Sequence, residues 1–535
     1  MTAETVARPS AWSPFRQPVF RALWTAQLGA NVGTWMQNVG AVWLMGSLGG
    51  SLVQIALVQT AATLPTFLLG VPAGALADIV DRRRMLLVTQ AWMALWAMVL
   101  GVLSYGGLMT PNLLLILTFL IGIGSAANLP AWQALQPDLV PRADLPQTIA
   151  LGAANTNLGR ILGPTLGGLV IAVSDTYLAF VLNALAAVAL FAVLATWRHP
   201  VQRTVLPAER LAAAVRAGTR YARNSPSLQA VLVRIVLFTA PANVVLTLLP
   251  ILARRELGLD ASGFGLLMGA FGLGAVLAAT VLPRLRARLG TDRLIGAATL
   301  TFAVGCVTLG LARTWPVVAL ALGLSGFAWL LALATMNLAA QRAVPDWVRA
   351  RGVGLYFVLM QGGLALGGVI WGIVGEGGSL EIAFFAAAAS LVVLGLVGIL
   401  RWRVAPVDDL DLRPSGHWPD PVVVVEPGLH DGPVLVTVEY QVVPARTREF
   451  AEAMRRVGRA RGRVGTSAWG LYADPSRPGR FVETFIVESW SEHLRQHDRV
   501  TETDRVLEDA ARAFLVEGST SLTTHYISAY ADIGP

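Results

Sequence analysis

The stretch Gly159-Arg-Ile-Leu-Gly163-Pro164-Thr-Leu-Gly167-Gly168 decides the fold. It lies inside an apolar run at about 148–172, and its glycines return 204 residues later in the chain. Repeated halves built from apolar segments are typical of membrane transporters. The chain is therefore predicted to contain two equivalent halves. The matched glycines are Gly159 and Gly363, Gly163 and Gly367, and Gly168 and Gly372.

Apolar runs of similar length extend on both sides of this stretch. The 535 residues are 55% hydrophobic and 14% charged, with a mean hydropathy of +0.59. Soluble domains are about 45–50% apolar and about 25% charged, which excludes an ordinary soluble enzyme. A membrane-spanning helix needs about 20 apolar residues, so the predicted fold is an all-α polytopic membrane protein with twelve transmembrane helices in two six-helix repeats. The runs lie at about 19–47, 53–76, 85–107, 112–134, 148–172, 177–197, 229–252, 264–283, 293–312, 316–339, 352–374 and 381–400.

A soluble tail follows the apolar runs. Its pattern predicts a small α+β (ferredoxin-like) domain of order β-α-β-β-α-β. Strands are expected at 434–443, 466–473, 481–489 and 520–530, and helices at 446–463 and 491–515. The predicted division of the chain is 1–197 for the N-terminal bundle, 198–228 for an amphipathic cytoplasmic linker, 229–403 for the C-terminal bundle, 404–433 for a second linker and 434–535 for the tail.

The charge distribution predicts the orientation in the membrane. The net charge of +8 divides into +14 for residues 1–403 and −6 for residues 404–535. With both termini inside, 22 arginines face the cytoplasm, and only Arg254, Arg255 and Arg313 face outward. The positive-inside rule favours this topology. We therefore expect a multi-pass protein of a bacterial inner (plasma) membrane with both termini cytoplasmic, and no nucleic-acid partner.

The segment Gly74-Ala-Leu-Ala-Asp78-Ile-Val-Asp81-Arg82-Arg83-Arg84 ends the second apolar run. It resembles the motif between helices 2 and 3 of the major facilitator superfamily. The resemblance implies a cytoplasmic gate, in which Gly74 permits close helix contact and Asp78 binds a neighbouring helix end or arginine. The alternative is that these positive charges only set topology. The matching segment 284–290 of the second half has no acid at this place.

The helix 5 stretch Gly159–Gly168 matches a Gly-x-x-x-Gly-Pro-x-x-Gly-Gly pattern of the superfamily's exporters. Small residues at this spacing let helices approach closely, and Pro164 favours a bend. A packing seam with no bearing on export is the alternative. With Arg160 and the run Asn31–Asn38, the pattern is most similar to the drug- and siderophore-exporter branch, over residues 1–403.

Two polar stripes lie on otherwise apolar helices, at Gln27, Asn31, Thr34 and Asn38 and at Thr239, Asn243 and Thr247. Polar groups rarely face lipid. In the family's fold, helices 1 and 7 line the central cavity, so the resemblance makes both stripes part of a substrate path, together with Asn155, Asn157 and Arg160. Hydrogen bonds that only join helices are the alternative explanation.

Arg160 predicts the sign of the substrate. An arginine near the bilayer centre costs about 2.5–3.5 kcal/mol on insertion scales, and the apolar runs offer it no acid. We expect neutral partners, such as Asn155 and Asn157, and a neutral or anionic substrate. The alternative is that Arg160 binds carbonyls freed by Pro164. Proton coupling is implied only by the resemblance, since the runs hold no central carboxylate or histidine.

The tail resembles antibiotic-biosynthesis-monooxygenase-like domains, which form dimeric α/β barrels. The resemblance rests on topology, Trp490 and His497 over about 434–530. His493 and His497 have the i, i+4 spacing of a metal pair, but a third ligand is not evident and a packing role is favoured. We therefore assign no catalytic residue, no metal and no cofactor.

The expected function is export of a small organic molecule, siderophore- or antibiotic-like, by alternating access. The expected partners are this small molecule, the lipid bilayer and protons, with a homodimer through the tail as a further expectation. Two alternatives stay open. The tail makes the protein bifunctional, as a cofactor-independent oxygenase or ligand-binding module, or the protein is a lysophospholipid flippase of the same fold.

Overall fold

The computed structural model describes residues 12–141, 144–197, 211–404, 411–419, 421, 423–425 and 427–529. Residues 198–210 of the first linker and parts of 404–433 therefore lie outside the described residues. The chain divides into two compact units. The membrane unit comprises Met1–Leu211, Val231–Leu338 and Gly354–Val404, and the tail unit comprises Ala212–Ala230, Ala339–Val353 and Ala405–Pro535.

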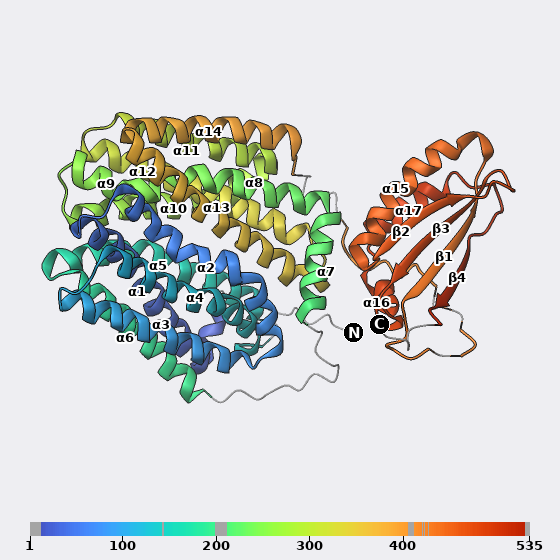
Figure 1. Ribbon diagram of the computed structural model, residues 1–535, viewed down its shortest axis with the longest axis horizontal. Helices are drawn as coiled ribbons and strands as arrows, with labels where there is room; N and C mark the ends of the chain where they lie inside the picture. Colours follow the sequence, from blue (N-terminus) through green and yellow to red (C-terminus); the bar gives the residue numbers. More distant parts are fainter. Residues whose placement is uncertain are drawn as a thin grey trace, which may run out of the picture. The chain divides into compact units, whose positions relative to one another are not determined.

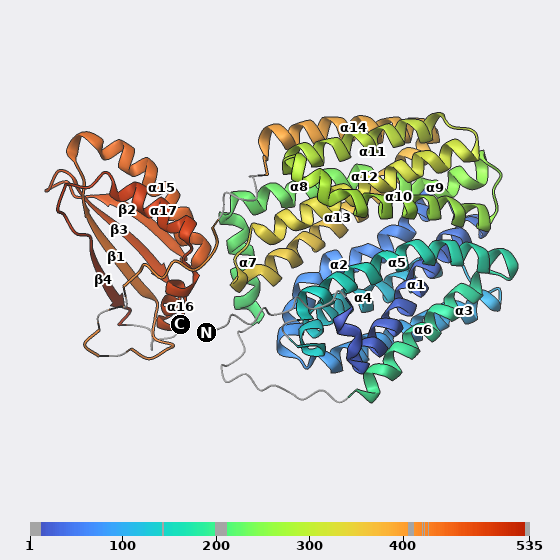
Figure 2. The same cartoon turned by 180° about the vertical axis from the view of Figure 1, so that it is seen from behind.

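The membrane unit is helical, and its two halves lie side by side, with α1–α6 in one and α8–α14 in the other (Figures 1 and 2). The first half holds α1 (Pro18–Ser47), α2 (Leu52–Ile79), α3 (Arg82–Tyr105), α4 (Pro111–Leu135), α5 (Leu145–Val173) and α6 (Thr176–Thr196). The second holds α8 (Pro226–Ala242), α9 (Val244–Ile251), α10 (Ala261–Arg288), α11 (Thr291–Leu311), α12 (Trp315–Arg342), α13 (Arg349–Gly377) and α14 (Leu380–Arg401).

Capping residues set the helix boundaries at both ends of the bundle. Ser51 starts α2 in a reciprocal capping box with Gln54, and Asp81 starts α3 by accepting the backbone N–H of Arg84. Such side chains satisfy backbone donors that the first turn of a helix leaves free. We name the two ends after these loops: α1 ends and α2 begins at the Gly50 end, and α2 ends and α3 begins at the Asp81 end.

Each of the twelve predicted apolar runs contains a helix. Within the described part of the chain, eleven spans are long and apolar enough to cross a membrane. The exception is α1, which has 30 residues. Polar side chains dilute its apolar character, so composition alone does not identify it as a membrane span. These side chains are Gln27, Asn31, Thr34, Gln37 and Asn38.

The seventh run, predicted as one helix over 229–252, is interrupted. Helix α8 ends at Ala242, α9 begins at Val244, and the π-helical segment Leu252–Glu256 follows. Pro241 lies at the break and Pro250 lies just before the π-helical segment. Proline cannot donate the helical hydrogen bond and disturbs the preceding turn, which explains why the helix is not continuous.

The glycines of α5 serve two different helix contacts. A Cβ at Gly163 would lie 2.4 Å from the Cβ of Trp35 in α1, and a Cβ at Gly168 would lie 2.8 Å from the Cα of Gly265 in α10. Neither position has room for a side chain. One face of α5 therefore packs within its own half, and the adjacent face packs against the other half.

The matched glycines of α13 repeat this arrangement. A Cβ at Gly367 would lie 2.2 Å from the carbonyl oxygen of Ala240 in α8, and a Cβ at Gly372 would lie 2.6 Å from the Cβ of Ala56 in α2. The 204-residue repeat in the sequence is thus a repeat of packing roles, because α5 contacts α1 and α10 where α13 contacts α8 and α2.

The tail unit contains a four-stranded antiparallel sheet of order β2-β3-β1-β4. Alternate residues of β1, Val434, Val436 and Val438, are buried against α15 residues such as Phe450 and Met454. Figures 1 and 2 show α15 and α17 along one face of the sheet. The elements are β1 (Val434–Gln441), α15 (Thr447–Val464), β2 (Ala468–Ala473), β3 (Arg480–Val487), α16 (Trp490–Arg499), α17 (Glu502–Arg512) and β4 (Leu522–Ile527).

The single helix predicted over 491–515 is wrong, because α16 ends at Arg499 and α17 begins at Glu502. Val500 is extended, and Thr501 starts α17 through a capping box with Asp504. A threonine followed three residues later by an acid is a helix-start signal, and it was present in the sequence.

Two further segments belong to the tail unit. Helix α7 (Leu211–Asn224) lies in the part of the first linker that the structure describes. In the second linker, the backbone N–H of Ser415 donates to the carbonyl of Val500, and the Trp418 indole donates to Glu508. Residues 411–418 thus pack with the tail and do not form a free connection.

Candidate functional site

The polar stripe of α1 joins α1 to α5. The Gln27 amide donates to Asn31 at 3.1 Å, and Asn31 donates to the Asn155 carbonyl oxygen at 2.8 Å. Asn155 in turn donates to the backbone carbonyl of Trp24 at 2.7 Å. Asn155 is buried, and its side-chain amide both accepts from Asn31 and donates to α1. For these residues the geometry favours the helix-joining alternative.

Three further residues proposed for the substrate path are half-buried. The Thr34 hydroxyl donates to the carbonyl of Ala30 within α1, and Asn38 is half-buried. Asn157, also half-buried, lies one turn before Arg160 in α5. Thr34, Asn38 and Asn157 stay candidates for the substrate path.

Arg160 contacts an aromatic ring of the neighbouring helix. Its guanidinium carbon lies 5.5 Å from the centroid of the Trp35 ring. Its Nε is buried without a hydrogen-bond partner, and no acid in the described part of the chain pairs with it. A cation over an aromatic face gains roughly 0.5–2 kcal/mol, which offsets only part of the cost of placing arginine in a membrane.

The stripe of the second half is buried completely. Thr239 and Asn243 are both 0% exposed. The Asn243 amide donates to the carbonyl of Leu364 at 2.8 Å and to the Thr247 hydroxyl at 3.2 Å. A Cβ at Gly363 would lie 2.1 Å from the Thr239 hydroxyl. In this state these side chains join α8 and α9 to α13, and substrate has no access to them.

The residues of the proposed gate have local roles within the first half. Asp81 caps α3, and Arg83 donates to the carbonyls of Leu194 and Ala195 at the end of α6, at 2.9 and 2.7 Å. Arg82 is half-buried. Among the described atoms, a Cβ at Gly74 would meet nothing within 4 Å. The side chain of Asp78 lies outside the described residues.

Several polar pairs were not singled out from the sequence. Asn183 of α6 donates to Gln37 of α1 at 2.6 Å, and both side chains are buried. Arg234 of α8, 4% exposed, forms an ion pair with Asp292 at the start of α11. The available signal for Arg234 was a single cation in an apolar run, the same signal that identified Arg160.

An ionic network lies beside the apolar core on the helical face of the tail sheet. Arg461 pairs with Glu483 at 3.2 Å and with Glu508 at 2.6 Å, and these three residues are 5% exposed or less. Trp418, from the second linker, lies under the Arg461 guanidinium at 4.5 Å. The two acids hold the pKa of Arg461 above its ordinary value despite burial.

Three histidines cluster beside this network. The ring of His493 lies 4.7 Å from His525 and 5.1 Å from His497. Burial, followed by the neighbouring His525, lowers the pKa of His493 to about 4. Among the described residues, no group of three or more His, Cys, Asp or Glu side chains has the geometry to hold a metal ion. Burial likewise lowers the pKa of His525, and the three rings pack against one another.

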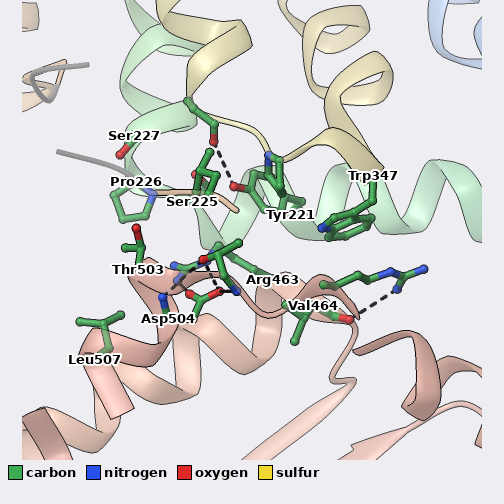
Figure 3. A pocket seen from close by; sticks show the side chains of 15 residues that line it. Tyr221, Ser225, Pro226, Ser227, Trp347, Arg463, Val464, Thr503, Asp504 and Leu507 are labelled. Atoms are coloured by element: carbon green, nitrogen blue, oxygen red, sulfur yellow. Dashed lines mark hydrogen bonds and ion pairs between the residues drawn. The ribbon is translucent and has the colours of Figure 1, made fainter. Parts of the chain in front are cut away.

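A cavity of about 180 Å³ within the tail unit separates α7 and residues 343–347 from the α15 and α17 helices. Figure 3 shows Tyr221 and Trp347 on one side and Arg463 and Asp504 on the other. Arg463 donates to the carbonyl of Asn224 at 3.3 Å and pairs with Asp504.

Tyr221, which also lines this cavity, donates to the carbonyl of Ala343 at 3.0 Å. The guanidinium of Arg499 lies 4.4 Å from the Trp347 ring. The described side chains around the cavity thus largely bind one another. Their contacts connect α7 and residues 339–353 to the tail domain, and we call this set of contacts the joint.

The match to a protein family covers nearly the whole chain. A family model described as "Transmembrane secretion effector" matches residues 9–532, the tail included. The chain is 29% identical over 429 residues to the multidrug efflux pump Tap of Mycobacterium tuberculosis, covering 76% of this chain and 98% of that protein.

Two further relatives are named as siderophore transporters. The chain is 28% identical over 404 residues to the enterobactin exporter EntS of Salmonella choleraesuis, covering 73% of this chain and 95% of that protein. It is 26% identical over 260 residues to the staphyloferrin A transporter of Staphylococcus aureus, where the match covers 48% of this chain and 65% of that protein.

Solved structures agree in fold. The nucleoside transporter NupG matches with a TM-score of 0.58 at 13% identity, over 71% of this chain and 99% of NupG. A bacterial homologue of the lysosomal transporter Spinster, solved facing inward, matches with a TM-score of 0.57 at 14% identity, over 72% of this chain and 95% of that chain. At such identities the likeness concerns fold alone.

Proposed function

We propose that this chain, which belongs to the transmembrane secretion effector family of the major facilitator superfamily, exports a small neutral or anionic organic molecule. It is a membrane transport protein and not an enzyme, and relatives of the chain are named as siderophore and drug exporters. A siderophore- or antibiotic-like substrate is the finer part of the proposal. The family match extends through the tail, so a separate oxygenase activity is not favoured.

The single observation that carries the substrate class is Arg160. Its guanidinium is held against Trp35, and the described residues provide it with no acid. A fixed cation that lacks an anionic partner attracts anions and repels cations. A substrate path that passes Arg160 would therefore be suited to carboxylates, catecholates and neutral molecules, and not to lipophilic cations.

We propose twelve membrane spans. The twelfth is α1, whose polar side chains bind neighbouring helices and so do not face lipid. In this topology the Asp81 end and both termini are cytoplasmic, as the arginine distribution favours. The protein then lies in the inner membrane of a bacterium, with the Gly50 end outward.

Contacts that close the two halves together at the Gly50 end support alternating access. At the Gly50 end, Glu376 of α13 accepts the backbone N–H of Val53 in α2 at 3.2 Å. Farther along the same pair of helices, Thr60 donates to the carbonyl of Ala365 at 3.0 Å. Transport requires that these contacts separate while the Asp81 ends close. Proton coupling is proposed from the superfamily resemblance.

For the tail we propose a ferredoxin-like domain with a regulatory or dimerising role. Its sheet order, β2-β3-β1-β4, fits this fold. Because α7 connects the two halves along the chain, a tail that binds α7 can influence their movement. The sheet face opposite the helices carries exposed Tyr472, Leu522 and Tyr526, which supports a homodimer through this face.

The test is transport into everted membrane vesicles, with and without a pH gradient. Catecholate siderophores, an acidic macrolide precursor, a lysophospholipid and the permanent cation ethidium are compared side by side. Uptake of the anions that requires the gradient and is lost in Arg160→Gln supports the proposal. Ethidium uptake that is unaffected by this substitution contradicts the electrostatic argument, and selective lysophospholipid uptake favours a flippase.

A further inference from the structure

A cavity of about 310 Å³ lies at the Gly50 end of the membrane unit. The first half contributes Trp43 and Gly46 from α1 and Gly50 from the following loop, and the second half contributes Arg254 and Arg255. The walls therefore come from both halves of the repeat. A space of this kind changes shape whenever the halves separate at this end.

Two cations line this cavity. The Arg254 guanidinium lies 5.8 Å from the centroid of the Trp43 ring, and Trp43 stacks with Phe264 at 6.4 Å. Within the described part of the chain, neither Arg254 nor Arg255 is paired with an acid. The third arginine assigned to this side, Arg313, behaves differently because it is paired with Glu381.

Three acids near this end are engaged elsewhere. Asp175 caps α6, Asp260 caps α10 and Glu376 accepts from the backbone of Val53. Glu256, next to Arg255, is exposed, as are the two arginines, and it is not part of the cavity wall. The described wall of this cavity thus contains two arginines and no carboxylate.

The backbone that carries the two arginines is unusual. Leu252–Glu256 is π-helical and directly follows Pro250. Short π-helical segments occur frequently at functional sites because they redirect side chains away from regular helical positions. The local conformation and the missing acids are independent observations that both indicate a ligand at this cavity.

We propose that this cavity binds the oxyanion of the exported molecule before release, with the guanidinium groups of Arg254 and Arg255 on the oxyanion and the ring of Trp43 against its apolar part. The inference rests on the proposed function and adds a second anion site, separate from Arg160. Arginine binds carboxylates and phosphates through paired, charge-assisted hydrogen bonds. Binding also stabilises the state in which the Gly50 ends of the two halves are together.

A lipid phosphate has the same chemistry as a soluble oxyanion. The position of the cavity between the halves favours the soluble molecule, but the experiment must separate the two sources. We therefore compare full-length protein in nanodiscs of phosphatidylcholine with nanodiscs that also contain phosphatidylglycerol.

The probes are 2-naphthoate and the neutral, equally shaped 2-naphthamide, with binding measured by calorimetry. We expect naphthoate to bind more tightly than naphthamide. The double variant Arg254→Gln/Arg255→Gln should weaken naphthoate binding at least about tenfold, because two charge-assisted hydrogen bonds are lost. Arg313→Gln, at the same end, is the matched control and should bind as the wild type does. Arg254→Lys/Arg255→Lys retains the charge and should recover part of the affinity.

The Arg160→Gln variant separates this site from the proposed function. Naphthoate binding that survives Arg160→Gln and disappears with Arg254→Gln/Arg255→Gln supports the outer site. The opposite pattern, equal binding of naphthoate and naphthamide, or no naphthoate binding overturns it, whatever the vesicle transport shows. Competition by phosphatidylglycerol that abolishes naphthoate binding assigns the arginines to lipid and also overturns the proposal. Anion transport that is absent while the outer site still binds naphthoate contradicts the proposed function instead.

Discussion

Arg160 of α5 and Trp35 of α1 are held together by the close approach of their helices. The guanidinium carbon lies 5.5 Å from the ring centroid, and Gly163, three residues after Arg160, leaves no room for a Cβ beside Trp35. The glycine that permits tight packing therefore also positions the charge. The α5 glycines and Arg160 can therefore be tested by separate substitutions, the glycines for a structural role and Arg160 for a binding role.

Arg160→Gln should retain folded protein and lose transport of anions by at least about tenfold, as expected for a lost charge-assisted contact. The measurement is vesicle flux together with the yield of monodisperse protein. Arg160→Lys is the control that keeps the charge and should retain part of the flux. Loss of folded protein in both variants contradicts the binding role and favours a structural one.

Gly163→Ala should destabilise the first half, because its Cβ would lie 2.4 Å from the Cβ of Trp35. Overpacking of this kind typically costs about 1–3 kcal/mol. The measurement is the thermal unfolding temperature in detergent. Gly74→Ala is the matched control, since among the described atoms its Cβ would meet nothing within 4 Å. Equal unfolding temperatures of the two variants would show that the α5 contact adapts without cost.

Asp78→Asn tests the gate that the sequence predicts at the Asp81 end. If Asp78 forms an ionic contact in the outward-open state, its loss should cost about 1–3 kcal/mol and shift a two-state equilibrium by about tenfold. Flux should fall while expression is unchanged. Flux at the wild-type rate would mean that the motif only sets topology.

The tail should lose stability as the pH falls from 7 to 5. The pKa of His493 is lowered to about 4 by burial, whereas an unfolded histidine has a pKa of about 6.5. The unfolded state therefore binds more protons in this range, and the free energy of unfolding falls by about 1.4 kcal/mol per pH unit below 6.5. Burial lowers the pKa of His525 in the same direction.

The measurement for this effect is urea unfolding of residues 411–535, which include Trp418, at pH 7 and pH 5. We expect a decrease of about 2 kcal/mol from His493 over this interval. His493→Gln removes this titrating group and should reduce the dependence, while the contribution of His525 remains. A wild-type stability that is independent of pH would contradict the buried, neutral state of this ring.

Arg463→Gln should loosen the joint between the tail and α7. It removes the ion pair with Asp504 and the hydrogen bond to the carbonyl of Asn224. Amide hydrogen exchange in α7 should then increase at least about tenfold, since a charged hydrogen bond contributes about 1.5–3 kcal/mol. Arg455→Gln changes an exposed arginine on the same helix and should leave exchange unchanged. Flux through both variants reports whether the joint regulates transport.

Sequence by itself determined the helical membrane class, the helix positions and the repeat. Hydropathy and spacing are local properties, and the run of glycines from Gly159 to Gly168 fits only a closely packed helix. The elements of the tail followed from alternation in the same way, except for the break at Val500. There Thr501 begins a new helix by capping α17, although the segments on both sides of the break are amphipathic.

Only the tertiary structure decided what the polar residues do. Gln27, Asn31 and Asn155 form one hydrogen-bond chain, while Arg160 lies on Trp35. The spacing of polar residues in the sequence shows that they share one face of a helix. Which hydrogen bonds they form depends on which helix packs against that face and at what distance. The same reason hid the membership of α7 and residues 339–353 in the tail unit, since contacts between segments more than a hundred residues apart leave no periodic signal in a single sequence.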